Sequence, residues 1–418
     1  MKTAKNCLPA PPASPSRGFC GAARRKPRQT IRAALAAGGY LTLLLLVATH
    51  AGAQDTNDAC VAAGRLLAAA HAAQTRADWQ AALANYQAAV SVAPNCAEAL
   101  INLGVAHNRL SQTEQAIIAF QKAIAVKPQL LAAHLNLGIT YFTTARYDPA
   151  IESLQHALSI DAANAQSRQL LALSLIARER FAEAAEQLEW LLAARQHREE
   201  APTLLALGEC YLRLKEFRKA ARSFEQLAQL VPSSAKAHLR LGEALDNLSE
   251  SARATGEFRR AVELDPTLAE AHYALGYALL RQGDLDEAAT QFERELSLNP
   301  KMVLSRYHLG KVHYQKGRYV QAVAHLTTVV ESAPNLRPAF ETLGQAYLKL
   351  KDAPRAAAVL ERAVSLSPDW PDAHALLGRA YLALGKRHEA QREFDTARRL
   401  SAQERRGLEK KVSRPKPN

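Results

Sequence analysis

The chain has 418 residues, of which 48% are hydrophobic, 6% are aromatic and 19 are glycine, a composition that favours closely packed helices. Its formal net charge of +13 suggests binding to nucleic acid, but residues 1–53 hold eight basic and no acidic groups, and residues 405–418 hold six basic groups and one acidic group. The long stretch between these ends is nearly neutral, which excludes an extended basic surface for nucleic acid.

The N-terminal segment has the pattern of a targeting sequence. A basic, proline-containing stretch leads into an apolar run over residues 33–49, and Ala51-Gly52-Ala53 supplies the small residues that a signal peptidase accepts. We expect residues 1–53 to be a signal peptide, residues 54–62 to be a short linker, and the protein to be periplasmic or secreted. One alternative is an uncleaved N-terminal membrane anchor, because about seventeen apolar residues are near the lower limit for crossing a bilayer. A cytoplasmic protein is the other alternative.

A leucine-glycine pair recurs through most of the remaining chain. It stands at Leu103-Gly104, Leu137-Gly138, Leu207-Gly208, Leu241-Gly242, Leu275-Gly276, Leu309-Gly310, Leu343-Gly344 and Leu377-Gly378, at a spacing of 34 residues with one gap of 70. An alanine follows twelve residues after each glycine position, a large apolar residue usually comes four residues later, and proline closes most units. Small residues let two helices approach closely, the large residue fills the gap beside them, and proline ends the second helix.

The period predicts ten helix-turn-helix units within residues 63–404, followed by a basic C-terminal tail at 405–418. The expected units are 63–96, 97–130, 131–164, 165–198, 201–234, 235–268, 269–302, 303–336, 337–370 and 371–404. This combination of positions resembles the tetratricopeptide repeat over about four fifths of the chain. The resemblance implies an all-α fold, a right-handed superhelical α-solenoid whose concave face is formed largely by the first helices. It also implies a scaffold that binds protein or peptide partners in that groove.

Three features depart from the regular pattern. The fourth unit has Ala172 in place of glycine, and a two-residue insertion follows it near residues 196–200, so we expect a change of curvature there. The seventh unit has Glu295 where other units have a small or apolar residue, which indicates a local polar contact. Beyond Gln403 we expect a partial capping helix before the basic tail.

Three of the five cysteines lie beyond the targeting segment. Cys60 and Cys96 flank the first unit, so an exported chain could join them, although equivalent positions in stacked repeats are often too far apart for a disulfide. Cys210 lies in a helical pattern and is interpreted as a small buried apolar residue.

The sequence contains no motif for catalysis or for binding a cofactor, such as a phosphate-binding loop, a nucleophile elbow or a calcium loop. We therefore predict no enzyme activity and no cofactor. No cysteine or histidine cluster has the spacing of a metal site. The histidines recur mostly once per unit and are interpreted as packing or surface residues.

The groove is where partner binding is expected, and its two halves differ. In units two to four the positions that the resemblance turns inward are largely apolar, whereas in units six to eight they carry tyrosines and charges. The candidate partner-binding residues are Asn102, Asn136, Arg240, Tyr273, Tyr277, Tyr307, His308, Lys311 and Tyr314. Tyrosines interleaved with cations could hold an extended peptide by stacking and hydrogen bonding. The alternative is that some of these tyrosines only pack between adjacent repeats.

The leading functional hypothesis is an exported scaffold that binds peptide segments or proteins in a bacterial envelope assembly. A first alternative is a structural or accessory subunit of a secretion, pilus or polysaccharide export apparatus, held by the N-terminal helix and the basic tail at an anionic surface. A second alternative is a partner that recruits substrate to a separate enzyme. The repeats themselves specify neither the partner nor the oligomeric state.

Overall fold

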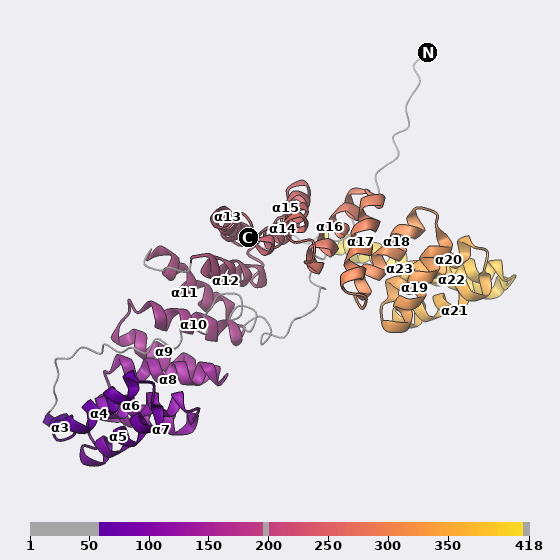
Figure 1. Cartoon of the computed structure of the whole chain (residues 1–418). Coiled ribbons are helices and arrows are strands. Elements are labelled where there is room, and N and C mark those ends of the chain that lie inside the picture. The colour runs from indigo at the N-terminus through magenta and orange to yellow at the C-terminus, as the bar shows by residue number, and fades with distance from the viewer. Residues whose placement is uncertain (1–57, 195–199, 413–418) are drawn as a thin grey trace. The chain divides into compact units, whose positions relative to one another are not determined.

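The computed structural model describes residues 58–194 and 200–412, and all regular secondary structure in these two ranges is helical. The helices follow one another in antiparallel pairs, so the predicted all-α solenoid is confirmed (Figure 1). The expected targeting segment at 1–53 lies outside the described residues. The predicted change of curvature also falls largely outside them, because residues 195–199 are not described.

The described helices form two compact units, divided between Pro232 and Ser233. The first unit contains a short helix α3 (Asp58–Val61) inside the expected linker, and then the pairs α4 (Gly64–Thr75) and α5 (Trp79–Val92), α6 (Ala97–Arg109) and α7 (Thr113–Val126), α8 (Leu131–Thr143) and α9 (Tyr147–Ile160), α10 (Ala165–Ala177) and α11 (Phe181–Ala193), α12 (Glu200–Arg213) and α13 (Phe217–Leu230). Helices α11 and α12 pack against each other, so the insertion between them does not divide the unit.

The second unit continues the same alternation. Its pairs are α14 (Ala235–Asn247) and α15 (Ser251–Leu264), α16 (Ala269–Gln282) and α17 (Leu285–Leu298), α18 (Val303–Gln315) and α19 (Tyr319–Ser332), α20 (Arg337–Lys349) and α21 (Ala353–Leu366), and α22 (Pro371–Ala383) and α23 (Arg387–Val412). Within each pair the two helices pack on each other, and each second helix also packs on the first helix of the next pair. One core therefore continues from pair to pair inside the unit.

The recurring glycine marks the point where the two helices of a pair cross. A Cβ atom added at Gly242 of α14 would lie 2.5 Å from Cε1 of Phe258 in α15, closer than real side chains pack. Phe258 is buried, so its ring has little room to move aside. By contrast, a Cβ atom added at Gly256 of α15 would meet nothing within 4 Å. The close approach of the helices therefore explains the periodic glycines and not the isolated one.

The turn inside each pair passes through the left-handed backbone region. The residues with φ between 58° and 88° are Ala77, Ser111, Ala145, Glu179, Lys215, Ser249, Gly283, Gly317, Lys351 and Gly385. Only three of these are glycine, so the repeat imposes the conformation on residues that rarely adopt it alone. In several pairs an aspartate follows and accepts a hydrogen bond from the backbone at the start of the second helix, as Asp78 does from Ala81.

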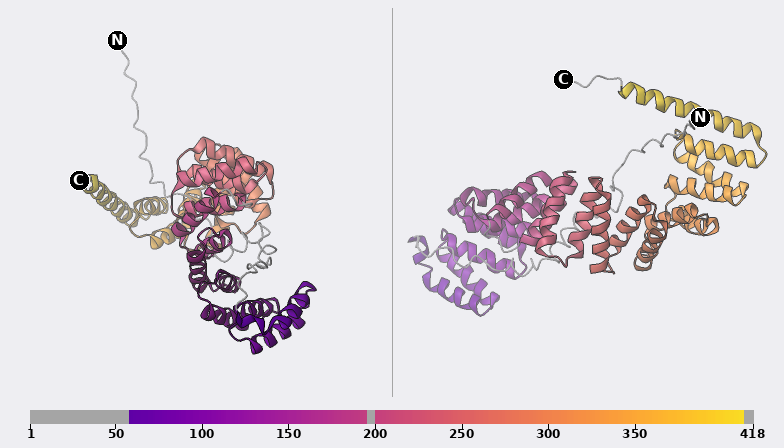
Figure 2. Two further views of the ribbon diagram at one scale, coloured as in Figure 1. Left: turned by 90° about the vertical axis from the view of Figure 1, so that its left-hand side faces the viewer. Right: turned by 90° about the horizontal axis from the view of Figure 1, so that it is seen from above.

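Helix α23 continues beyond Gln403, where a partial capping helix was expected, and runs into the expected basic tail as far as Val412. It runs without a break for 26 residues, twice the 13 residues of its partner α22, and Figure 2 shows it continuing past the end of α22. Ala402 stands where most units have the closing proline, so its backbone N–H is available and the helix can continue through this position. The helical segment beyond Gln403 is thus a continuation of the second helix of the last pair.

Candidate functional site

Helices α16 and α18 bring four of the candidate residues together around one imidazole. The ring centroid of His308 lies 4.9 Å from that of Tyr307, 5.1 Å from Tyr277 and 6.0 Å from Tyr273. Phe292 of α17 stacks on the same imidazole at 5.6 Å. Phe292 was not among the candidate residues, because it occupies the regular core position of a second helix. We call Tyr273, Tyr277, Tyr307 and His308 the tyrosine cluster.

Burial makes the interior of the tyrosine cluster electrically neutral. Nδ1 of His308 is buried without a hydrogen-bond partner in the described structure. This burial, together with the nearby charge of Lys311, lowers the pKa of His308 to about 4, so the imidazole is uncharged at neutral pH. Burial also raises the pKa of Tyr273, whose side chain is almost fully enclosed. Tyr273 and His308 therefore pack between α16, α17 and α18.

Other candidate side chains of this region remain partly exposed. Tyr277 on α16 and Tyr307, Lys311 and Tyr314 on α18 are half-buried. The ring of Tyr314 lies 5.7 Å from that of Tyr319 at the start of α19. These rings have one side against the protein and part of their surface open to solvent, as an aromatic contact for a partner requires.

Arg240 on α14 is held by carboxylates of its own unit. It donates two hydrogen bonds to Glu243, at 2.8 and 2.9 Å, and its Nη2 lies 3.6 Å from Glu270 Oε2 on α16. A partner carboxylate would have to compete with these two groups for the guanidinium. Arg240 therefore links two adjacent pairs in addition to any contact with a partner.

Asn102 and Asn136 belong to the first unit, whereas the tyrosine cluster belongs to the second. Asn102 Nδ2 lies 3.3 Å from His71 Nε2, and Asn136 Nδ2 donates to the carbonyl of Ala132, one turn earlier in α8, at 2.8 Å. The apolar residues expected on the inner face beside them are largely enclosed, as Val105 and Leu135 show. The inner face of this unit is thus partly used for packing between its own helices.

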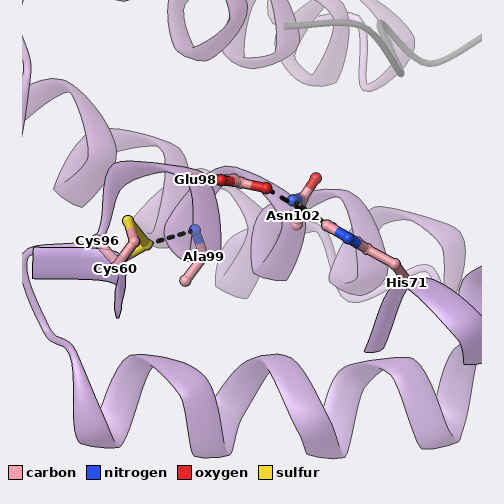
Figure 3. The surroundings of a disulfide bond; sticks show 6 residues. All are labelled: Cys60, His71, Cys96, Glu98, Ala99 and Asn102. Atoms are coloured by element: carbon pink, nitrogen blue, oxygen red, sulfur yellow. Dashed lines mark hydrogen bonds and ion pairs between the residues drawn. A yellow bond between two sulfur atoms is a disulfide. The ribbon is translucent and has the colours of Figure 1, made fainter. Parts of the chain in front are cut away.

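A disulfide joins Cys60 of α3 to Cys96, with their Cα atoms 4.9 Å apart. Cys96 precedes α6, and its sulfur accepts a hydrogen bond from the backbone N–H of Ala99 at 3.4 Å (Figure 3). The disulfide can form because α3 packs against α6 and so brings Cys60 close to Cys96, which precedes that helix. The disulfide thus fastens the N-terminal end of the first pair to the second.

The third cysteine of the described residues is not a reactive thiol. Cys210 in α12 is buried, and this burial, with a smaller effect from Glu209, raises its pKa to about 12. The thiolate needed for nucleophilic or redox chemistry is therefore scarce at neutral pH. Its position agrees with the interpretation of Cys210 as a buried apolar residue.

Several histidines connect the helices of a pair to the turn that precedes it. Nε2 of His134, His272 and His374 lies 2.9, 2.9 and 2.8 Å from the carbonyl oxygens of Pro128, Pro266 and Pro368. Nδ1 of His272 and His374 bonds to Gln291 and Glu393, each nineteen residues later on the second helix. The spacing of nineteen was a signal available in the sequence, and it was missed because the acceptor changes from repeat to repeat.

Two kinds of site are not found among residues 58–194 and 200–412. No three histidine, cysteine, aspartate or glutamate side chains there are grouped closely enough to hold a metal ion. None of the helices in these ranges is both long enough and apolar enough to cross a membrane.

Comparison with known proteins gives a consistent family match along the chain. Models of the tetratricopeptide repeat match residues 67–130, 131–164, 170–217, 205–269, 273–336 and 347–408. No curated protein matches the chain.

Solved structures of similar fold are distant in sequence. MamA from Desulfovibrio magneticus RS-1 is 24% identical, with 40% of this chain and 96% of MamA covered and a TM-score of 0.39. YrrB, described as a TPR protein with an unusual peptide-binding site, is 21% identical, with 47% and 98% covered and a TM-score of 0.41. Pseudomonas aeruginosa PilF is 22% identical, with 51% and 97% covered and a TM-score of 0.41.

Proposed function

The chain belongs to the tetratricopeptide repeat family, and we propose that it is an exported, non-catalytic scaffold that binds extended peptide segments of partner proteins on α16 and α18. Repeat arrays of this kind present extended surfaces to protein partners. The observation that carries the proposal is the group of partly exposed tyrosines, Tyr277, Tyr307 and Tyr314, with Lys311 among them.

The geometry of these residues suits a peptide better than a small polar ligand. Tyr277 and Tyr307 both contact the half-buried imidazole of His308, which fixes their rings without charging the site. Rings already held in place lose little conformational freedom when a partner packs on them. The ammonium of Lys311 can serve as a hydrogen-bond donor to the carbonyls of an extended backbone.

We expect peptide binding to weaken about tenfold when Tyr277 and Tyr314 are both replaced by alanine, because two aromatic contacts of a binding surface are lost. The probe is a phage-displayed library of random twelve-residue peptides selected on the wild-type protein. The affinities of the enriched peptides are then measured by fluorescence anisotropy for both proteins. Tyr273 and His308 are left intact, because both pack between helices and their removal would disturb the fold.

The matched control is Tyr147→Ala. Tyr147 is the first residue of α9, a second helix of the other unit, and it is also half-buried. The Tyr147→Ala variant should bind the selected peptides with the same affinity as the wild type. Equal affinity of the double variant and the control, with both folded by circular dichroism, would remove α16 and α18 from consideration as the binding surface.

Export is supported by two independent features of the chain. The pattern of residues 1–53 fits a signal peptide, and the disulfide between Cys60 and Cys96 is typical of proteins that reach an oxidising compartment. The membrane-anchored form of the proposal shares the disulfide and differs only in whether the first segment is retained.

We expect the mature protein to begin at Gln54, because Ala51-Gly52-Ala53 places small residues where a signal peptidase requires them. Intact-mass spectrometry of the protein isolated from its host measures this directly. A chain that keeps Met1 and fractionates with membranes would contradict cleavage and favour the anchored form. Replacing Ala51 and Ala53 with leucine is the control, since it should block processing and leave the repeats folded.

A further inference from the structure

The C-terminal helix α23 carries a row of arginines that the packing of the repeats does not use. The exposed arginines of this helix are Arg387, Arg392, Arg398, Arg399, Arg405 and Arg406, which we call the basic face. The buried residues Ala390 and Ala397 mark the opposite side of the helix, where it packs on α22. The rest of the second unit therefore leaves these arginines open to solvent.

Helical geometry places the six arginines on one side. At about 100° per residue, Arg387, Arg398 and Arg405 fall about 80–100° from the line of Ala397, and Arg392, Arg399 and Arg406 fall about 180–220° from it. The two rows span an arc of about 140° on the side of the helix away from Ala397, and they extend along the helix for about 28 Å. Between Arg387 and Arg406 the one acid in this arc is Asp395, whose Oδ1 is 3.6 Å from Nη1 of Arg398. Glu409 falls in the same arc, beyond Arg406.

We propose that the basic face of α23 binds the surface of an anionic phospholipid bilayer. A straight helix with two parallel rows of arginine can lie on a plane of phosphate groups and reach it with both rows at once. Each basic residue held near such a surface adds to the attraction. This surface is separate from the tyrosine cluster on α16 and α18, so a scaffold bound to lipid by α23 would keep those helices available for a partner.

A bilayer fits these observations better than a nucleic acid does. Nucleic-acid binding over an extended site requires basic groups spread along the protein surface. Here the charge between residues 54 and 404, a stretch that includes the first four arginines of the basic face, is balanced overall, so there is no extended basic surface. The six arginines are instead grouped along one side of a single helix. One helix with basic residues along one side is sufficient to bind a flat anionic surface.

The test uses the purified full chain and large unilamellar vesicles of phosphatidylcholine, with or without 30% phosphatidylglycerol. The variant Arg392→Gln, Arg399→Gln, Arg406→Gln removes one row of the basic face. We expect it to bind the anionic vesicles about 100-fold more weakly than the wild type, at roughly fivefold for each arginine. Raising the salt concentration from 50 to 300 mM should weaken vesicle binding by the wild type and reduce the difference in affinity between the wild type and the variant.

The matched control is Arg218→Gln, Arg222→Gln, Arg294→Gln, which removes three exposed arginines from α13 and α17. It lowers the net charge equally and should retain wild-type binding. Because the apolar run at 33–49 can itself enter lipid, the measured quantity is the difference between anionic and neutral vesicles. Equal losses in the two triple variants, or equal binding to both kinds of vesicle, would overturn the proposal. Binding to duplex DNA without binding to anionic vesicles would overturn it in favour of nucleic acid.

Discussion

Breaking the Cys60–Cys96 disulfide is expected to lower the free energy of local unfolding of the first helix pair by about 3 kcal/mol. The two cysteines are 36 residues apart, and opening a loop of that size returns a large conformational entropy to the unfolded segment. Because each pair of a repeat array contacts only its neighbours, the loss should be confined to α3, α4 and α5 and should decline beyond α6. Native-state hydrogen exchange of these backbone amides, with and without reductant, measures the change.

The variant Cys60→Ala removes the bond more cleanly than a change at Cys96. The sulfur of Cys96 accepts the backbone N–H of Ala99 at the start of α6, and that hydrogen bond can persist in a free thiol. Reductant should have no further effect on Cys60→Ala, since both remaining described cysteines are thiols: Cys210 is unpaired in the wild type, and Cys96 has lost its partner. Unchanged exchange in α4, or an equal loss in α4 and α20, would contradict a local fastening role.

The repeat architecture could be predicted from the sequence because its key positions have one physical solution. Gly242 and its equivalents stand where a Cβ atom would collide with a phenylalanine or leucine of the second helix, so glycine recurs at a spacing of 34 residues in most units. The turn residues show the opposite case. Lys215 and Ser249 adopt the same left-handed backbone conformation as Gly283, and the surrounding helices enforce it. Because the neighbouring helices impose this backbone conformation, the residue type at the turn varies from pair to pair. The sequence therefore has no recurring residue that would predict it.

The candidate residues of the site could be named from the sequence, but the burial of their side chains could not. Tyr277 and Tyr307 were selected because the resemblance to the tetratricopeptide repeat places their positions on the inner face. The degree of enclosure does not follow from that resemblance, because it depends on which side chains of three helices meet, and Phe292 comes from a helix that the inner-face pattern does not include. The burial that leaves His308 uncharged likewise depends on this three-helix contact.

Glu295 is an acidic residue enclosed in the core of the second unit. It lies in α17 where the equivalent residues of other second helices are Ala261 and Ala363, and its side chain is 1% exposed. The structure supplies no hydrogen-bond partner to its Oε2. Burial, with repulsion from Glu270 as a smaller cause, raises its pKa from 4.5 to about 7. The polar contact expected here from the sequence is therefore incomplete.

This shift gives the stability of the second unit a pH dependence whose sign is fixed. The folded state holds the proton of Glu295 more tightly than the unfolded state, so the free energy of unfolding falls as the pH rises from about 4.5 to 7 and changes little above. At ~1.4 kcal/mol for each pKa unit, the loss is on the order of 3 kcal/mol. Glu295→Gln keeps the size of the side chain and cannot ionise. We therefore expect it to match the wild type near pH 4.5 and to exceed it by about that amount at pH 8, as measured by urea unfolding.

Other groups titrate over the same range, so the informative quantity is the difference between wild type and variant at each pH. Glu331→Gln is the matched control, because Glu331 is an exposed glutamate on α19 and its loss should leave the pH profile unchanged. Parallel profiles for the wild type and Glu295→Gln would show that the carboxyl is already ionised in the folded protein.

The carboxyl of Glu295 lies close enough to Tyr273 to raise the pKa of that tyrosine, and Tyr273 packs against His308. Ionisation of Glu295 therefore occurs beside the tyrosine cluster. If the strain of ionisation reaches that cluster, peptide affinity should fall between pH 6 and 8 in the wild type and stay constant in Glu295→Gln.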